Sequence, residues 1–174
     1  ALRMARIDSA GTVVGNWTSL PSVAFQLPWR EAGGPSRDAY SFDSARDTVY
    51  AFFDVTDGSV VFEVDYEVAN AVQPYDDVAE LYWKYDGDQW AGASEDVSLT
   101  IALPVPEGAT VTPGENVRAW GHGPLDGVVE VKPDGTVAYQ VPLVKAGQYA
   151  EARVLFPRQW LTALSPEAAA ANQG

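Results

Sequence analysis

The fold class of this chain is decided by the stretch DDVAELYWKYDGDQW at residues 76–90 and by EDVSLTIALP at residues 95–104. The first stretch is dense in aromatic and branched residues up to Tyr85, and its Asp-Gly-Asp segment then has turn chemistry. The second stretch alternates apolar and polar residues until Pro104 ends it. An aromatic strand, a turn and an alternating strand are typical of a β-sandwich, and neither stretch contains a catalytic motif.

Two further hairpins are predicted from alternation and turn chemistry. Residues 60–68 place apolar side chains on one face and acidic ones on the other, which predicts a half-buried strand. A Thr-Asp-Gly turn predicts that this strand pairs with residues 48–55. A Pro-Asp-Gly turn likewise predicts a hairpin between residues 129–132 and 137–141.

The remaining strands are expected in short segments separated by Gly, Pro, Asp and Asn, near residues 2–8, 22–28, 79–85, 96–103, 116–120 and 149–156. About nine or ten such strands predict an all-β fold, an antiparallel β-sandwich, with a short C-terminal helix within 157–164. We expect a long surface loop at residues 30–44. A single domain should span residues 1–164, and residues 165–174 have the composition of a linker-like tail.

The composition excludes several classes of function. The formal net charge of −13, from 24 acidic and 11 basic residues, repels phosphate backbones, so a nucleic-acid partner is not expected. The chain contains no cysteine, which excludes disulfides and thiolate metal sites. No Gly-rich phosphate loop, nucleophile elbow or dinucleotide motif occurs, so we expect no cofactor.

His122 is the only histidine, and it lies in a turn made of Gly121, Gly123 and Pro124. An imidazole there could bind a ligand or act as a base. A single histidine cannot supply a two- or three-histidine zinc site, and no serine–carboxylate motif accompanies it. The favoured interpretation is a turn histidine bonded to the backbone, and no metal site is predicted.

Paired carboxylates occur at Asp76 and Asp77, with Glu80 close by, and again at Asp86 and Asp88. In a β-sandwich, two such groups could serve a glycosidase as acid and nucleophile or base. Nothing in the sequence predicts a buried carboxylate with a raised pKa, so solvated surface charge is the favoured interpretation. The Asp-Gly-Asp segment lacks the spacing of an EF-hand and is predicted to be a hairpin turn.

The tryptophans divide by their position in the pattern. Trp83 alternates within a strand and is predicted to be a core residue, whereas Trp90 and Trp120 lie beside turns, where an aromatic face could meet a sugar or a peptide. No catalytic residue is predicted. The candidate ligand-binding residues are Trp90, Trp120, His122, Asp76 and Asp77.

Four blocks, in their order and spacing, carry a family resemblance: DDVAELYWKYDGDQW, EDVSLTIALP, AWGHGPLDG at 119–127 and EARVLFP at 151–157. They resemble the bacterial predicted-membrane-protein family known as domain of unknown function 2207, over about residues 48–157. The resemblance implies an extracytoplasmic domain of a bacterial envelope protein, held at the membrane by segments outside this sequence. It assigns no catalytic residues.

The leading hypothesis is therefore a non-enzymatic domain on the extracytoplasmic face of a bacterial cell membrane, which binds an envelope protein or polymer. An alternative is a carbohydrate-binding or carbohydrate-active β-sandwich module that uses Trp90, Trp120 and nearby acids. A third is a structural or assembly role, in which the acidic surface keeps the domain soluble and away from the membrane.

Overall fold

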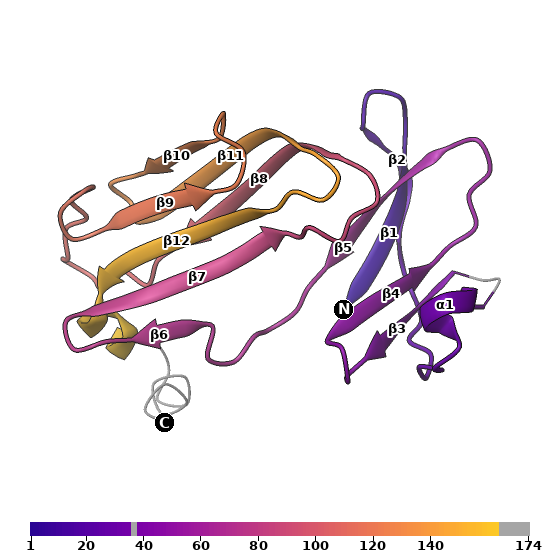
Figure 1. Ribbon diagram of the computed structural model, residues 1–174, viewed down its shortest axis with the longest axis horizontal. Coiled ribbons are helices and arrows are strands. Elements are labelled where there is room, and N and C mark those ends of the chain that lie inside the picture. Colours follow the sequence, from indigo (N-terminus) through magenta and orange to yellow (C-terminus); the bar gives the residue numbers. More distant parts are fainter. Residues whose placement is uncertain (36–37, 164–174) are drawn as a thin grey trace. The chain divides into compact units, whose positions relative to one another are not determined.

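The computed structural model describes residues 1–35 and 38–163, and the predicted all-β fold class is confirmed (Figure 1). The described residues form twelve strands rather than nine or ten, and all strand pairs in the sheets are antiparallel. They make four small sheets, accompanied by the one-turn helix α1 (Trp29–Ala32) and the 3-10 turn η1 (Arg158–Ala163). The predicted tail at 165–174 lies outside the described residues.

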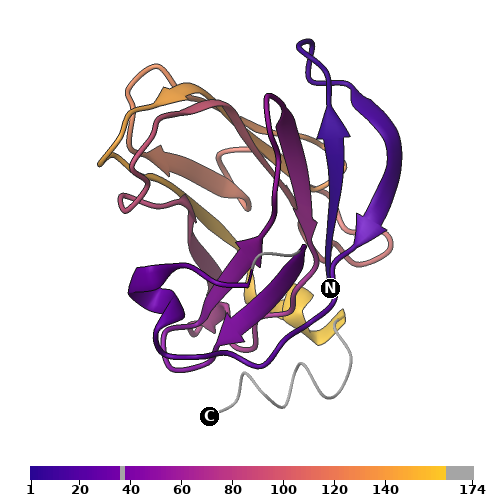
Figure 2. The same ribbon diagram turned by 90° about the vertical axis from the view of Figure 1, so that its right-hand side faces the viewer.

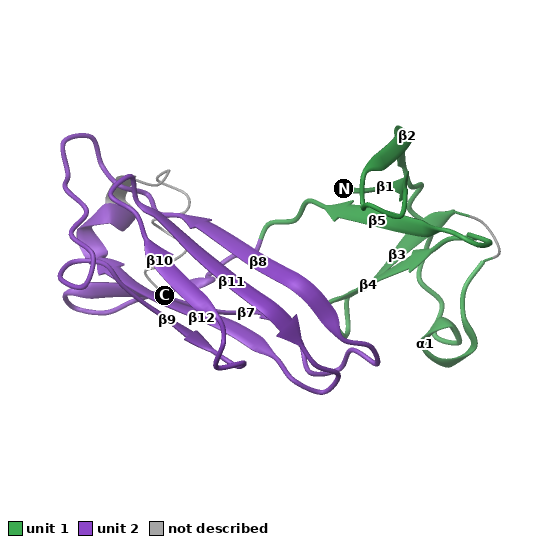
Figure 3. Cartoon of the chain, turned by 90° about the horizontal axis from the view of Figure 1, so that it is seen from above, with its two compact units in different colours: residues 1–67 green, residues 68–174 purple. Residues whose placement is uncertain are grey.

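The chain divides into two compact units, Ala1–Glu67 and Val68–Gly174 (Figure 3). The first unit contains the sheet β2-β1-β5 and the hairpin β3-β4 (Figure 2). Its strands are β1 (Leu2–Ile7), β2 (Val13–Ser19), β3 (Ala39–Asp43), β4 (Thr48–Phe52) and β5 (Ser59–Val64). Among its described residues, its buried core cluster is small and contains Leu2, Met4 and Leu20, with Val60 and Phe62 packed against them.

The predicted hairpin between residues 48–55 and 60–68 is wrong. The strand β4 pairs with β3, and β5 pairs with β1 along its whole length, from Leu2 opposite Val64 to Ile7 opposite Ser59. The apolar face of β5 packs against Leu2 and Met4, which are about 60 residues away in sequence. A local turn signal carries no information about so distant a partner.

The early part of the chain also differs from expectation. No strand forms at 22–28, where the structure has a single bridge from Ser22 to Tyr40, while β2 and β3 were not predicted. Most residues of β2 are exposed, so this strand has no alternating burial pattern to read. The strand β3 lies inside the segment predicted to be a loop, 30–44.

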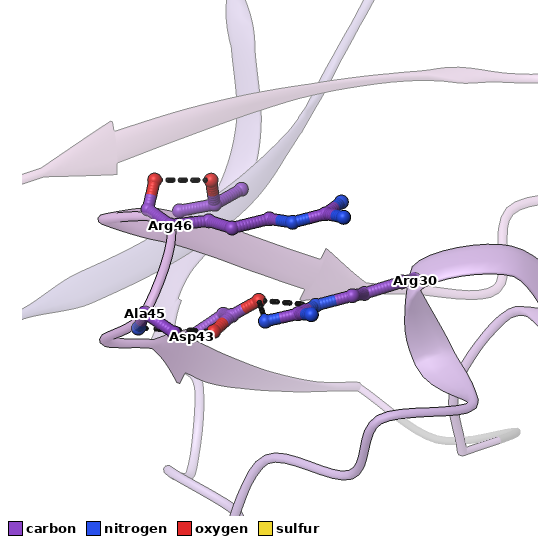
Figure 4. A network of polar contacts seen from close by, with 5 residues as sticks. Arg30, Asp43, Ala45 and Arg46 are labelled. Atoms are coloured by element: carbon purple, nitrogen blue, oxygen red, sulfur yellow. Dashed lines mark hydrogen bonds and ion pairs between the residues drawn. The ribbon is translucent and has the colours of Figure 1, made fainter.

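A buried ion pair joins α1 to Asp43, the last residue of β3 (Figure 4). The Nε of Arg30 donates to Asp43 Oδ2 at 2.7 Å, and the backbone N–H of Ala45 donates to the other oxygen, Oδ1, at 3.1 Å. The side chain of Asp43 is 2% exposed, and the guanidinium of Arg30 lies 5.5 Å from the ring centre of Phe25. The carboxylate is thus compensated by a cation and by the backbone.

The second unit is a two-layer sandwich, with the sheets β10-β11-β8 and β6-β7-β12-β9 (Figures 1 and 3). Its strands are β6 (Val72–Pro74), β7 (Val78–Asp86), β8 (Ser94–Ala102), β9 (Arg118–His122), β10 (Val128–Val131), β11 (Thr136–Val144) and β12 (Ala150–Pro157). Both sheets contribute to one core, Val137 and Tyr139 from the first and Ala152, Val154 and Phe156 from the second.

Two sequence predictions for this unit are confirmed. The hairpin β10-β11 forms with Val131 opposite Val137, across the Pro-Asp-Gly turn. The expected C-terminal helix is the 3-10 turn η1, whose Trp160 is 4% exposed and stacks on Phe156 at 6.3 Å between ring centres. The turn closes one end of the core.

Candidate functional site

Three connections meet at one end of the second unit, which we call the loop end: residues 87–93, 123–127 and 145–149. The strand register fixes this arrangement. Asp86, the last residue of β7, is opposite Ala150, the first of β12, and the next residue of β12, Glu151, is opposite His122, the last of β9. In the other sheet, Val144 ends β11 opposite Ser94, which begins β8. The loop end therefore combines the ends of both sheets.

Three of the five predicted ligand-binding residues lie at or near the loop end. Trp90 belongs to the connection 87–93 and is 66% exposed. Trp120 and His122 both lie on the outer face of β9, and Trp120 is 40% exposed. The other two, Asp76 and Asp77, do not join them. They lie before β7 begins, at the opposite end of the sandwich, and both are exposed.

The outer face of the strands β7, β12 and β9 carries a cross-strand row formed by Tyr82, Arg153 and Trp120. The Nη2 of Arg153 lies 2.8 Å from Oε2 of Glu80, and its guanidinium lies 5.5 Å from the ring centre of Trp120. The hydrogen bond to Glu80 raises the pKa of Arg153. Tyr82 donates its hydroxyl proton to Glu151, and this bond raises the pKa of Tyr82. Both carboxylates are thus engaged as acceptors.

A second row lies closer to the loop end. The Nζ of Lys84 lies 3.6 Å from Glu151 and 3.9 Å from Asp88, and it is 4.7 Å from the ring centre of Tyr149. The ring of His122 is 5.8 Å from that of Tyr82, with an angle of 39° between the ring planes. The lysine is therefore already paired with acids and with an aromatic face.

A pocket of about 360 Å³ opens beside these rows, under the connection from β9 to β10. Its walls include three tyrosines, the predicted His122, and apolar side chains of the connection and of β10 and β11. Tyr139 is buried and donates its hydroxyl proton to the carbonyl of Arg153 at 3.3 Å. Burial raises the pKa of Tyr139. The lining residues are Tyr85, Gly121, His122, Gly123, Pro124, Leu125, Gly127, Val128, Val129, Tyr139, Val141 and Tyr149.

A β-bulge at the end of β7 changes the side on which Asp86 lies. The register steps by two residues on β7, from Lys84 to Asp86, against one on β12, from Glu151 to Ala150, so Tyr85 is an extra residue. Strict alternation would place Asp86 on the exposed face with Lys84. Instead it lies opposite the fully buried Ala150 and is 6% exposed. Its Oδ1 has no hydrogen-bond partner among the described residues.

Comparison with models of known protein families gives a match for this chain. A family model described as "Predicted membrane protein (DUF2207) N-terminal domain" matches residues 16–156. The chain belongs to this family. No curated protein and no solved structure matches it.

The match to domain of unknown function 2207 confirms the sequence-based resemblance and extends it. The four blocks place the resemblance at about 48–157, whereas the family model starts at residue 16 and takes in most of the first unit. The family is one of predicted membrane proteins. Over residues 1–35 and 38–163, the structure has no helix with the length and apolar character needed to span a bilayer.

Four residues at or near the candidate site were not among the predicted ligand-binding residues: Tyr82, Tyr149, Arg153 and the buried Asp86. The alternation of 79–85 and 150–156 could have identified Tyr82 and Arg153 as outward residues on adjacent strands. Asp86 was assigned to a solvated turn, and alternation alone could not reveal the bulge that buries it. In the described part of the chain, no group of three or more His, Asp or Glu side chains could hold a metal ion.

Proposed function

We propose that this domain is a non-enzymatic interaction module of the bacterial cell envelope, on the extracytoplasmic face of the membrane, and that its loop end binds a protein or polymer of the envelope. The observation that carries the proposal is the exposed apolar surface of the loop end. Trp90 is 66% exposed, Leu125 is fully exposed, Val128 is 62% exposed and Tyr149 is 39% exposed. Apolar side chains brought together at one end of a rigid sandwich favour a binding surface.

The carboxylates of the outer face support a binding role over a hydrolytic one. Glu80 and Glu151 are 16% and 13% exposed, and each is committed to a cationic or hydroxyl partner. A general acid or nucleophile needs a carboxyl group that can reach the substrate. Hydrolysis of an envelope polymer that is abolished by Asp76→Asn or Asp77→Asn would contradict this part of the proposal.

The location of the domain can be tested because this chain has no cysteine. The variant Ala109→Cys places a thiol at an exposed position far from the loop end, in the connection from β8 to β9. In intact cells that express the full-length protein, a membrane-impermeant maleimide should label this variant above the wild-type background. Labelling that requires prior permeabilisation of the membrane would refute the extracytoplasmic location.

A matched control uses a buried alanine. Ala152 is 0% exposed, so Ala152→Cys should stay unlabelled in intact cells and react only after the protein is unfolded. Equal labelling of both variants in intact cells would show that the domain is unfolded there, and the experiment would then be repeated under milder expression.

A carbohydrate-binding module is the second candidate, and the row of Tyr82, Arg153 and Trp120 favours it. Two exposed aromatic rings flank a guanidinium and lie near the carboxylate of Glu80, so apolar faces and hydrogen-bonding groups alternate as sugars require. Titration calorimetry against a glycan panel tests this candidate. Binding should disappear in Trp120→Ala, and the absence of heat with every glycan would remove it.

A further inference from the structure

The strand β8 is an edge strand whose outer side has no neighbouring strand among the described residues. In the sheet β10-β11-β8 it pairs with β11 from Ser94, opposite Val144, to Ala102, opposite Thr136 (Figure 3). In the described chain, none of the backbone hydrogen bonds made outside the strand ladders involves β8. Its outward N–H and C=O groups are therefore free to pair with a further strand.

This edge is long, whereas the other edge strands are shorter or interrupted. The strand β8 has nine residues. The strand β6 has three and ends at Pro74, β9 has five and β10 has four. The strand β2 has seven, but its Gly15 has a φ of +88° and its register with β1 shifts between Met4 and Arg6. The strands β4 and β5 have five and six. Short length, proline and irregularity protect sheet edges, and β8 has none of them beyond Asp96.

The regular part of the β8 edge carries no charge. Asp96 has a φ of +50°, which interrupts the extended backbone, so the regular edge is the run Val-Ser-Leu-Thr-Ile-Ala at 97–102. Its Val, Leu and Ile side chains pack against the cores of the second unit, and its Ser, Thr and Ala side chains are exposed. An uncharged run of about six residues that is rich in β-branched side chains and lacks Pro and Gly is a strong template for strand pairing.

A second copy of β8 matches this template on both faces. Residues directly opposite each other in an antiparallel pair lie on the same face, so the apolar positions of one strand must meet those of the other. If the pair is centred on Leu99, Val97 of one copy lies opposite Ile101 of the second copy, on the core side. Ser98 then lies opposite Thr100 on the outer side. The alternation of β8 is thus complementary to itself.

The charges of β8 also permit this pairing. The chain has a formal net charge of −13, so surfaces that bring its acids together oppose self-association. In the pair centred on Leu99, Asp96 faces Ala102 of the second copy, and no acid faces another acid. A pair centred on Thr100 would instead place Asp96 opposite Pro104, which has no N–H to donate. The register centred on Leu99 is therefore favoured.

We propose that two copies of this domain associate through β8, antiparallel and centred on Leu99, so that their two three-stranded sheets β10-β11-β8 join into one continuous sheet. Such an interface is isologous, with the same edge contributed by each copy. Backbone pairing along about six residues is a small interface, so the dimer is weak and depends on concentration. This inference goes beyond the proposed function, because the edge at 97–102 contributes no residue to the loop end.

Sedimentation velocity of the chain of residues 1–174, from micromolar to millimolar concentration, tests the association. The wild type should pass from monomer to dimer as the concentration rises. The double variant Ser98→Asp/Thr100→Asp places carboxylates directly opposite each other in the pair, so its dissociation constant should rise by roughly tenfold or more. A wild type that sediments as a monomer at every concentration would overturn the proposal.

The matched control adds the same two charges outside β8. Ala109→Asp/Thr110→Asp changes two exposed positions in the connection from β8 to β9, and this variant should dimerise as the wild type does. If both double variants weaken the dimer equally, net charge rather than the β8 edge controls the association, and the proposal is wrong.

Single cysteines test the register without adding charge. The chain has no cysteine, so each variant carries one thiol, and Ser98 and Thr100 are exposed, so both variants should fold. In the proposed pair, residue 98 of one copy lies opposite residue 100 of the other and not opposite itself. Mild oxidation of a mixture of Ser98→Cys and Thr100→Cys should therefore give the mixed disulfide dimer in clear excess. A yield in the mixture no higher than in either variant alone would overturn the register.

Hydrogen exchange separates a second copy from a strand of another protein. The β8 amides that do not bond to β11 should gain protection as the concentration of the pure chain rises. Protection that appears only after an envelope extract is added would overturn self-pairing in favour of a strand from another envelope protein.

Discussion

Gly123 is the residue on which the pocket wall depends most directly. Its φ of +132° lies in a region that side chains rarely adopt, and a Cβ there would lie 2.3 Å from the backbone oxygen of Tyr149. Backbone cannot move aside as a flexible side chain would. The close approach of the connection 123–127 to the start of β12 therefore requires glycine.

We expect Gly123→Ala to destabilise the second unit more than Gly147→Ala. Gly147 also has a positive φ, of +76°, but a Cβ there would meet nothing within 4 Å. Gly147→Ala should therefore lower the free energy of unfolding only through backbone strain, by about 1–2 kcal/mol. Gly123→Ala should lose a further ~1–3 kcal/mol from the clash. Urea unfolding of the two variants measures the difference, and equal free energies of unfolding would contradict the close approach.

Tyr139 makes the stability of the second unit sensitive to alkaline pH. Burial raises the pKa of its hydroxyl above the ordinary value of 10.0. Because the folded pKa is the higher one, the contribution to stability is complete below about pH 10 and is lost as the pH rises through the folded pKa. Tyr139→Phe should therefore lose less stability than the wild type above about pH 10. Parallel pH dependence of unfolding in the two proteins would contradict this assignment.

At the scale of elements, two ion pairs of the first unit differ in what they contribute. The pair of Arg30 and Asp43 joins α1 to the hairpin β3-β4, and its carboxylate is 2% exposed. The pair of Arg3 and Glu63 joins β1 to β5 in solvent, with side chains 45% and 39% exposed. Solvent screening removes most of the contribution of the Arg3–Glu63 pair to stability.

Asp43→Ala should therefore cost about 3–5 kcal/mol, because it leaves Arg30 partly buried without its partner. Glu63→Ala should cost less than ~1 kcal/mol. Thermal and urea unfolding, followed through signals of the first unit, measure both values. A loss for Glu63→Ala as large as that for Asp43→Ala would show that burial does not control these pairs.

The elements that could be predicted from the sequence are those in which local chemistry and long-range pairing agree. The hairpin β10-β11 is fixed by its own turn, so its alternation and its Pro-Asp-Gly turn were sufficient. The strand β5 was located through Val60 and Phe62, but its partner was not, because β1 supplies the matching apolar face from the start of the chain. Edge strands such as β2 carry too little burial to produce a pattern.

The candidate site divides in the same way. Trp90, Trp120 and His122 were identified because aromatic residues beside glycine-rich turns are readable, and the register brings all three to or near the loop end. Asp76 and Asp77 were grouped with them by residue type rather than by position. The full length of β7 separates these two aspartates from the loop end. Tyr149 became visible only as part of the pocket wall, and the burial of Asp86 only through the bulge in β7.

At the scale of the whole molecule, the two units have separate cores of different size. Among the residues that the structure describes, the buried hydrophobic cluster of the first unit has three members, whereas the larger cluster of the second unit has ten. More buried apolar area gives a larger free energy of opening. The first unit should therefore be the less stable one.

Hydrogen exchange can test whether the first unit is the less stable one. Amides of β1 and β5 should exchange through openings of lower free energy than amides of β7, β11 and β12. Denaturant should reveal two transitions, the first reported by Trp17 and Trp29. One cooperative transition with uniform protection would instead support the single domain over 1–164 that the sequence suggests.

The bulge at Tyr85 changes the side of the sheet on which the next residue of β7, Asp86, lies. One residue removed between Ala79 and Lys84 would turn the outward face of the strand inward, whereas removal of the bulged Tyr85 itself would leave Asp86 directly after the outward Lys84 and still opposite the buried Ala150. The side of β7 on which its last acid lies is therefore set by the register of the strand as well as by the identity of the residue.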